Sequence, residues 1–265
     1  MTTDEKIEVL KSREYLVVKG NELIQQNRFE LSLPEQKTIA FICSMIKLAT
    51  PETKSKYYPD NPWQLDYQFN IRDYCKVCGI DYNNGKNYAD VKVTLKKLSD
   101  RSMWLDDGNG EVLVRWLSKA RTNKKSGIAQ IEIDRDLAPF FFDLQEKFTQ
   151  YQLYNILAMK SAFSVRIYEL MKSYAFQKSK TFEIDDLKRL LMVEDVKSYS
   201  NFNLFKTKVL EKAQEEINEL TDLNIYYEPI TKGRKVVKVK FRIEQKNPIE
   251  RILAGATAND RLGEL

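Results

Sequence analysis

The stretch from Gly79 to Asn87 carries the residue types of a phosphate-binding loop. It holds two glycines, and the second is followed by Lys86. In such loops backbone amides surround a phosphate, and a Ser or Thr after the lysine binds magnesium. Here Gly79 and Gly85 are one residue too far apart, and Asn87 stands in place of the Ser or Thr. We therefore predict a turn between two helices rather than a nucleotide site.

Cys75 and Cys78 form a second candidate site, a Cys-x-x-Cys pair. Zinc needs about four ligands, and the chain adds only Cys43 and contains no histidine. Both cysteines fall on the apolar face of a predicted short helix, beside Ile71 and Tyr74. Thiols in that position pack as small hydrophobic groups. We predict structural cysteines, no metal and no cofactor.

The lack of histidine also limits catalysis, because histidine is the commonest general base at neutral pH. A rolling-circle nicking enzyme could use one of the 14 tyrosines as its nucleophile, but such enzymes position a metal with paired histidines. A nuclease or integrase-like enzyme would need a metal-binding carboxylate cluster, and the sequence shows no compelling one. We predict a protein that is not an enzyme.

Length and charge set broader limits. The 265 residues fit two domains, and a formal charge of +5 is so mild that the location of basic residues matters more than their total. No apolar run is long enough to cross a membrane, and the start, MTTDEKIEV, is unlike a signal peptide. Three cysteines are an odd number and fit a reducing compartment. We expect a cytoplasmic protein without a membrane partner.

The elements that would position these residues follow the order of a winged helix-turn-helix. A capping box at Ser32–Glu35 predicts a helix, and alternating apolar residues over 63–69 predict a strand. A short helix begins at Ile71, and a longer helix has one apolar face, formed by Tyr88, Val91, Leu95 and Leu98. We expect a hairpin of strands at 103–105 and 112–117, then a basic loop and a strand at 128–133.

The same order recurs in the second half. A strand passes into a short helix at 182–187, and the longer helix that follows has an apolar face of Phe205, Val209, Ala213, Ile217 and Leu220. A final hairpin pairs 225–227 with alternating residues over 237–243. A repeat of roughly a hundred residues indicates two related domains rather than a solenoid. We predict an α+β fold of two tandem winged-helix domains, at 1–147 and 148–248, joined through 136–147 and followed by a flexible tail at 249–265.

Basic residues gather on the two elements that a winged helix places against DNA, the helix after the turn and the hairpin wing. The first repeat offers Lys86, Lys97 and Arg101 on the helix, with Asp90 among them, and Arg115, Lys119, Arg121, Lys124 and Lys125 in the basic loop. The second offers Asn203, Lys206, Thr207 and Lys208 at the helix start, before Glu211, Glu215, Glu216 and Glu219, and a wing, KGRKVVKVKFR, that includes Arg234, Lys235 and Lys238. Charged runs often only keep a surface solvated, but two patches on the expected elements favour DNA binding.

Several segments resemble the initiator replication proteins of theta-replicating plasmids: 21–24, Ser164–Leu170, 205–210 and the glycine-arginine-lysine wing at 233–235. The resemblance covers nearly the whole chain. It implies binding of double-stranded DNA at repeated origin sites (iterons) and at the protein's own promoter, and contact with a host replication initiator and helicase in a bacterial cytoplasm. It implies that monomers start replication, and that dimers, formed through the first domain, repress the protein's own promoter. Monomer and dimer would be in equilibrium. The second domain would be the main DNA reader.

The resemblance assigns contacts with bases or phosphates to Lys206, Thr207, Lys208, Arg234 and Lys235. Thr207 departs from the family, because many relatives have a basic residue there. A dedicated transcriptional repressor with tandem winged helices would share all these features and would differ in binding one inverted repeat at a promoter. A plasmid partition or scaffold protein would bind DNA without an effect on replication.

Overall fold

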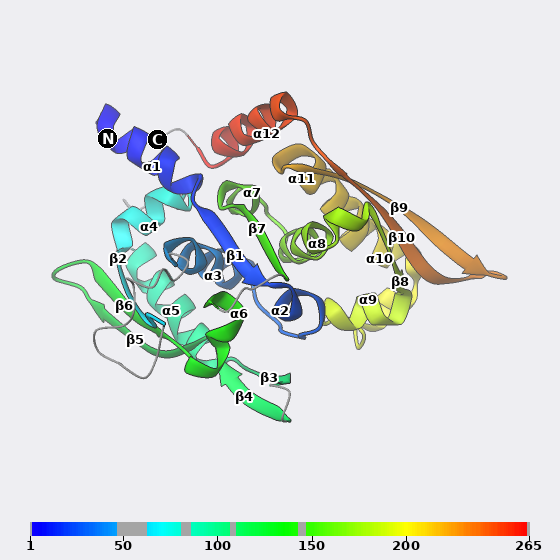
Figure 1. The fold of residues 1–265 in the computed structure, drawn as a ribbon, viewed down its shortest axis with the longest axis horizontal. Coiled ribbons are helices and arrows are strands. Elements are labelled where there is room, and N and C mark those ends of the chain that lie inside the picture. Colours follow the sequence, from blue (N-terminus) through cyan, green and yellow to red (C-terminus); the bar gives the residue numbers. More distant parts are fainter. Residues whose placement is uncertain (1, 47–62, 81–85, 107–109, 143–146, 264–265) are drawn as a thin grey trace. The chain divides into compact units, whose positions relative to one another are not determined.

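The computed structural model describes residues 2–46, 63–80, 86–106, 110–142 and 147–263 (Figure 1). Gly85, the second glycine of the predicted turn, lies outside these residues. The chain forms two compact units, one from residues 1–23 and 37–153 and the other from 24–36 and 154–264. The predicted boundary at 147–148 therefore falls six residues before the passage at 153–154, and the first half lends a segment to the second unit.

The described residues of the first unit form three small antiparallel sheets, with strand orders β1-β7, β2-β6-β5 and β3-β4. Its strands are β1 (Leu16–Gly20), β2 (Asp66–Asn70), β3 (Ser102–Asp106), β4 (Glu111–Arg115), β5 (Leu117–Asn123), β6 (Ile128–Ile133) and β7 (Phe148–Gln152). Its helices are α1 (Thr3–Arg13), α4 (Ile71–Val77), α5 (Asn87–Asp100), α6 (Pro139–Phe142) and the 3-10 turn η2 (Arg135–Leu137). The chain passes between the units within α2 (Asn21–Gln25) and α3 (Leu33–Met45).

The two helices of the predicted helix-turn-helix form in the first unit, as α4 and α5. Asn70 begins α4, because its Oδ1 accepts a hydrogen bond from the Arg72 backbone N–H at 2.8 Å. Gly79 ends it with a left-handed φ of 66°, a conformation that favours glycine. In α5, Val91, Leu95 and Leu98 are buried.

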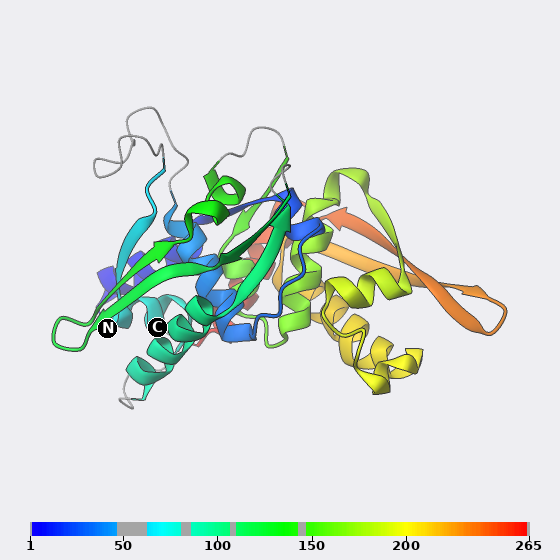
Figure 2. The ribbon, with the colours of Figure 1, turned by 90° about the horizontal axis from the view of Figure 1, so that it is seen from below.

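The predicted hairpin of the first unit forms, but the segment predicted as a basic loop is a strand. β3 and β4 pair only with each other, and the segment predicted as a basic loop forms β5, which pairs with β6. β6 follows β5 after the four residues 124–127 and pairs with it as a hairpin. The sequence did not reveal β5, because Leu117 is its one buried residue and the strand lacks the alternation of apolar and polar residues. The wing of this unit is therefore the β5–β6 hairpin (Figure 2), and β3–β4 is an addition to the winged-helix order.

The second unit has one sheet, with the order β8-β10-β9. Its elements are α7 (Tyr154–Leu157), α8 (Ala162–Ser173), η3 (Ala175–Gln177), β8 (Ser179–Glu183), α9 (Ile184–Leu190), η4 (Lys197–Ser200), α10 (Phe202–Phe205), the π-helical η5 (Lys206–Glu211), α11 (Lys212–Leu220), β9 (Leu223–Lys232), β10 (Lys235–Gln245) and α12 (Pro248–Arg261). This order matches β2-β6-β5, with the later wing strand in the middle of both sheets. The repeat inferred from the sequence pattern is thus present in the topology.

The join and the C-terminal tail depart from expectation. Residues expected to join the domains belong to the first unit, where Leu137, Ala138 and Phe141 are buried. The N-terminal residues, which lack apolar periodicity, form α1, whose capping box joins Thr2 and Glu5. The predicted flexible tail is wrong for the residues of α12, because a second capping box at Asn247 and Glu250 begins a helix there. That helix packs on α7 and α11 and buries Ala254 and Ala258.

Candidate nucleic-acid interface

The longer helix of the second unit is a continuous run from α10 through η5 to α11. Asn201 begins it, since its Oδ1 accepts a hydrogen bond from the Asn203 backbone N–H at 2.9 Å. The predicted apolar face is confirmed, because all five of its residues are buried: Phe205, Val209, Ala213, Ile217 and Leu220. Burial of that face leaves Asn203, Thr207 and Lys208 exposed and Lys206 half-buried. These polar residues occupy the first turns of the helix, as predicted.

The wing of the second unit is the β9–β10 hairpin, which extends beyond the helices of its own unit (Figure 2). Val239, Phe241 and Ile243 are buried, so the predicted alternation along β10 is confirmed. The hairpin turns at Gly233, whose φ of 63° favours glycine. Lys232, Arg234 and Lys235 are exposed at this tip. Within the described part of the chain, no carboxylate forms an ion pair with these three cations.

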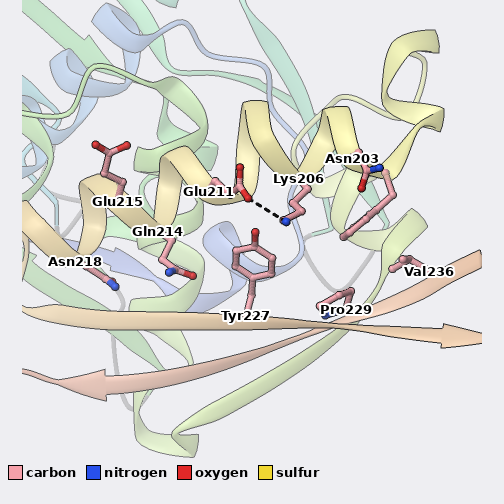
Figure 3. A pocket seen from close by; sticks show the side chains of 10 residues that line it. Asn203, Lys206, Glu211, Gln214, Glu215, Asn218, Tyr227, Pro229 and Val236 are labelled. Atoms are coloured by element: carbon pink, nitrogen blue, oxygen red, sulfur yellow. Dashed lines mark ion pairs between the residues drawn. The ribbon is translucent and has the colours of Figure 1, made fainter.

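Helix and wing border a polar groove of about 680 Å³ (Figure 3). Two predicted DNA-binding residues, Asn203 and Lys206, line it together with Gln214, Asn218, Tyr227 and others. Lys206 Nζ lies 3.1 Å from Glu211 Oε1. Partial burial, and secondly the charge of Glu211, raise the pKa of Tyr227 to about 12, so this hydroxyl stays protonated at neutral pH. The groove thus offers hydrogen-bond donors and acceptors beside one cation and its carboxylate.

The groove residues in the later turns of the helix and on β9 were not predicted from the sequence as DNA contacts. Gln214 and Asn218 follow the basic start of the helix, and Tyr227 lies on a strand whose alternation indicates only which face is buried. Asn218 is also a structural residue, since its side chain bonds the backbone of Ile225 in both directions, at 2.7 and 3.0 Å. No sequence signal marks these residues, because the groove exists only after helix and wing pack together.

Two predicted surface charges have structural partners instead. Lys238 forms an ion pair with Glu183 on β8 at 2.7 Å, so it lies toward the base of the wing rather than at its tip. Glu216, expected among the acidic residues on the helix surface, is buried. Its two carboxylate oxygens accept hydrogen bonds from the backbone N–H groups of Lys160 and Ser161, at 2.8 and 3.2 Å. Glu216 therefore holds the beginning of α8 in place.

The first unit places its basic residues on the equivalent elements. Lys124 and Lys125 lie exposed at the turn of the β5–β6 wing, and the Asn123 Oδ1 accepts a hydrogen bond from the Lys125 N–H at 2.9 Å. Lys86 and Arg101 flank α5 as its N-cap and C-cap, and Lys97 lies on it. Lys86 and Lys97 are exposed and Arg101 is half-buried. Asp90 is exposed on the same helix, and Asp100 pairs with Lys96. The helix of this unit is therefore more mixed in charge than its wing.

Arg166, in the α8 segment quoted above for its resemblance, is a buried structural residue. Its Nη2 donates a hydrogen bond to the Asn27 carbonyl at 2.9 Å, and its guanidinium lies 4.4 Å from the centre of the Phe29 ring. Burial lowers the pKa of Arg166 to about 10. This contact attaches the segment from the first half of the chain to the second unit.

The three cysteines are free and buried. Burial raises the pKa of Cys75 to about 11 and of Cys78 to about 12, so both are neutral thiols packed among apolar groups. In residues 2–263, outside the gaps given above, no group of three or more Cys, Asp or Glu side chains is arranged to bind a metal. No helix in the described ranges has the length and apolar character needed to cross a membrane.

Residues 16–172 match the family described as "Initiator Replication protein, WH1", and residues 183–243 match the one described as "Initiator Rep protein, WH2". The chain belongs to the initiator replication protein family. The first matched region contains the winged helix of the first unit and runs on through most of α8, and the second runs from the end of β8 into β10. These matches confirm the predicted family and the predicted α+β fold of two winged-helix domains.

Curated relatives and a solved structure are similar to this chain. An "Uncharacterized 27.6 kDa protein" of Escherichia coli is 24% identical over 250 residues, which cover 91% of this chain and 99% of the relative. The "PI protein" of Escherichia coli is 27% identical over 145 residues, 49% of this chain and 47% of that protein. The structure titled "Crystal structure of Pi initiator protein in complex with iteron DNA" has a TM-score of 0.70 at 20% identity, covering 89% of this chain and 99% of that one. This likeness shows a shared fold.

Proposed function

We propose that this protein initiates plasmid replication by binding iterons in double-stranded DNA at the plasmid origin. Family membership supports initiation, and the shared fold with a Pi initiator protein solved on iteron DNA supports this class of DNA. The protein acts by binding rather than by catalysis. The host replication initiator and helicase would carry out the later steps.

The observation that carries this proposal is the pairing of a polar helix start with a basic wing tip in one unit. Asn203, Lys206 and Thr207 stand on the first turns of a helix whose opposite face is buried. Base edges in a major groove are read from such a position. Arg234 and Lys235 stand at the exposed hairpin tip, where cations bind phosphates of any sequence. Helix and wing therefore divide base reading from phosphate binding.

The first unit would contribute a weaker DNA contact in the monomer and the self-contact in a dimer that represses the protein's own promoter. Its β3–β4 sheet supports the second role. Trp104 and Leu113 face each other across the two strands, with 59% and 53% of their surfaces exposed. A two-stranded sheet also has open edges that can pair with another chain.

Supplying the gene in trans to a plasmid that carries only the origin tests the proposal. We expect replication with the gene and none without it. Footprinting on the same DNA should protect direct repeats at the origin. Protection of one inverted repeat at a promoter alone, with no replication, would indicate a dedicated repressor. DNA binding without any effect on replication would indicate a partition or scaffold protein.

A further inference from the structure

The ion pair between Lys206 and Glu211 depends on an unusual stretch of helix. The two residues are five positions apart, and in an α-helix such positions point about 140° away from each other. Residues 206–211 are instead π-helical, and the hydrogen bonds of a π-helix join residues five apart. The wider turn brings Lys206 Nζ to 3.1 Å from Glu211 Oε1. The backbone therefore gives Lys206 a fixed carboxylate partner at the first turns of the reading helix.

This pair faces the groove rather than the protein core. The Lys206 and Glu211 side chains are 41% and 45% exposed, and both line the space between helix and wing. Tyr227 rises from β9 with its hydroxyl toward the pair (Figure 3). A DNA duplex held between helix and wing would therefore meet a carboxylate as well as an ammonium group.

A lysine without such a partner would bind any phosphate it could reach. Its ammonium is a compact charge on a flexible stem, and phosphates lie along the whole length of every duplex. Glu211 opposes this in two ways: it occupies the ammonium group, and its charge repels a phosphate that approaches. At the correct site, a guanine O6 or N7 at the right position can take the place of the carboxylate as acceptor for Lys206.

We propose that Glu211 is a specificity-determining residue, which positions Lys206 for base reading and disfavours its contact with phosphates of unrelated DNA. This inference rests on the proposed function, because it takes the helix between Asn203 and Glu211 as the DNA reader. Glu211 acts through Lys206 and through its own charge, and it stabilises the free protein only weakly, since exposed ion pairs are worth little.

Glu211→Gln tests the proposal. Dissociation constants are measured over a range of KCl concentrations for an origin duplex carrying one footprinted repeat and for a shuffled duplex of the same composition. We expect the variant to bind the shuffled duplex about two- to five-fold more tightly, the equivalent of one exposed ion pair. Its salt slope on that duplex should steepen by about one, because Lys206 gains a phosphate. Binding to the origin duplex should change by less than about two-fold. The ratio of the two dissociation constants, shuffled duplex over origin duplex, should therefore fall.

Glu215→Gln is the matched control. Glu215 lines the same groove on the same helix, and no ion pair of this residue is found among the described residues. The substitution removes the same charge, and we expect it to leave the salt slope on the shuffled duplex unchanged. An equal gain in shuffled-duplex binding from Glu215→Gln would show a simple charge effect and would overturn a specific role for Glu211.

A double variant shows whether Glu211 acts through Lys206. When Glu211→Gln is added to the Lys206→Gln variant, it should no longer steepen the salt slope on the shuffled duplex, because the ammonium group is gone. An unchanged effect in that background would overturn the positioning role. If the wild-type protein binds both duplexes equally, the proposed function itself is wrong. If it discriminates between them and Glu211→Gln discriminates equally well, only the inference about Glu211 is wrong.

Discussion

Lys238 on β10 stands directly opposite Glu183 on β8, and their side chains form an ion pair with Nζ 2.7 Å from Oε1. Opposite charges at facing positions stabilise an antiparallel pair of strands. The pair ties the base of the wing to the rest of the sheet. The cations at the tip, Arg234 and Lys235, have no such carboxylate in the described part of the chain.

This difference predicts unequal effects along the wing. Arg234→Ala and Lys235→Ala should each weaken binding to all duplexes alike and lower the salt slope by about one. Lys238→Ala should lower the slope by less, because Glu183 already neutralises part of its charge. Fluorescence anisotropy titrations at several KCl concentrations measure these slopes. A full unit lost from Lys238→Ala would show that this lysine leaves Glu183 for a phosphate.

The start of the reading helix should behave differently from the wing. Lys206→Ala or Lys208→Ala should cost about 1–3 kcal/mol of binding free energy if the residue reads a base edge. Each should also relax specificity at one position of the repeat, which a panel of singly substituted duplexes would reveal. Identical behaviour of Lys206→Ala and Arg234→Ala across that panel would contradict the division between base reading by the helix and phosphate binding by the wing.

The buried cysteines predict a loss of stability in alkali. An unfolded thiol has a pKa of about 8.5, whereas burial raises the pKa of Cys78 to about 12. Between these values the unfolded chain has released the proton that the folded protein keeps, so the free energy of unfolding falls as pH rises. This thiol contributes a slope of about 1.4 kcal/mol per pH unit in that window.

Urea unfolding of wild type and Cys78→Ala from pH 7 to pH 10 measures the difference in slope. Above pH 8.5, the free energy of unfolding of Cys78→Ala should fall less steeply with pH than that of the wild type, because the variant lacks this thiol. Equal slopes in the two proteins would show that the thiol ionises freely in the folded state.

Two neighbouring glutamates should differ in their effect on stability. Glu216→Ala removes the acceptor of two backbone N–H groups before α8 and should lower the free energy of unfolding by about 1–3 kcal/mol. Glu215→Ala, on the exposed face one residue earlier, should change it by less than about 0.5 kcal/mol. Urea midpoints at pH 7 compare the two variants. Similar losses would mean that the hydrogen bonds from Lys160 and Ser161 contribute nothing measurable.

The exposed pair on β3–β4 predicts a variant with weakened self-association. Trp104→Lys should raise the dimer dissociation constant about ten-fold or more if the ring lies at the centre of the contact. Phe176→Lys is the control, because Phe176 is an even more exposed aromatic residue and belongs to the second unit. Sedimentation with an inverted-repeat duplex and with a single repeat counts the bound chains. Two chains on every single repeat would contradict binding by the monomer.

The sequence by itself determined the helices of both winged helix-turn-helix units, the order of the strands in the second unit, and the faces that these elements bury. The buried stripe from Phe205 to Leu220 can be read from a short window of sequence, because a helix places every third or fourth residue on one side. The alternation from Val239 to Ile243 can be read in the same way, because a strand places every second residue on one side. The cap at Asn70 and the turn at Gly233 are equally local. The chemistry of the basic residues followed from their places on these elements.

Only the tertiary structure decided which strands pair and which charges remain on the surface. β5 is a wing strand because β6 lies beside it, and Glu216 is buried because the start of α8 packs against it, whereas its neighbour Glu215 faces the groove. α12 packs on α7 and α11 through the small residues Ala254 and Ala258, whose short side chains give only a weak periodic signal in the sequence. The contacts of Glu216 and α12 involve residues distant in the chain, and periodicity within a short window carries no information about them. β5 has one buried residue, Leu117, so its sequence lacks the alternation that marks a strand.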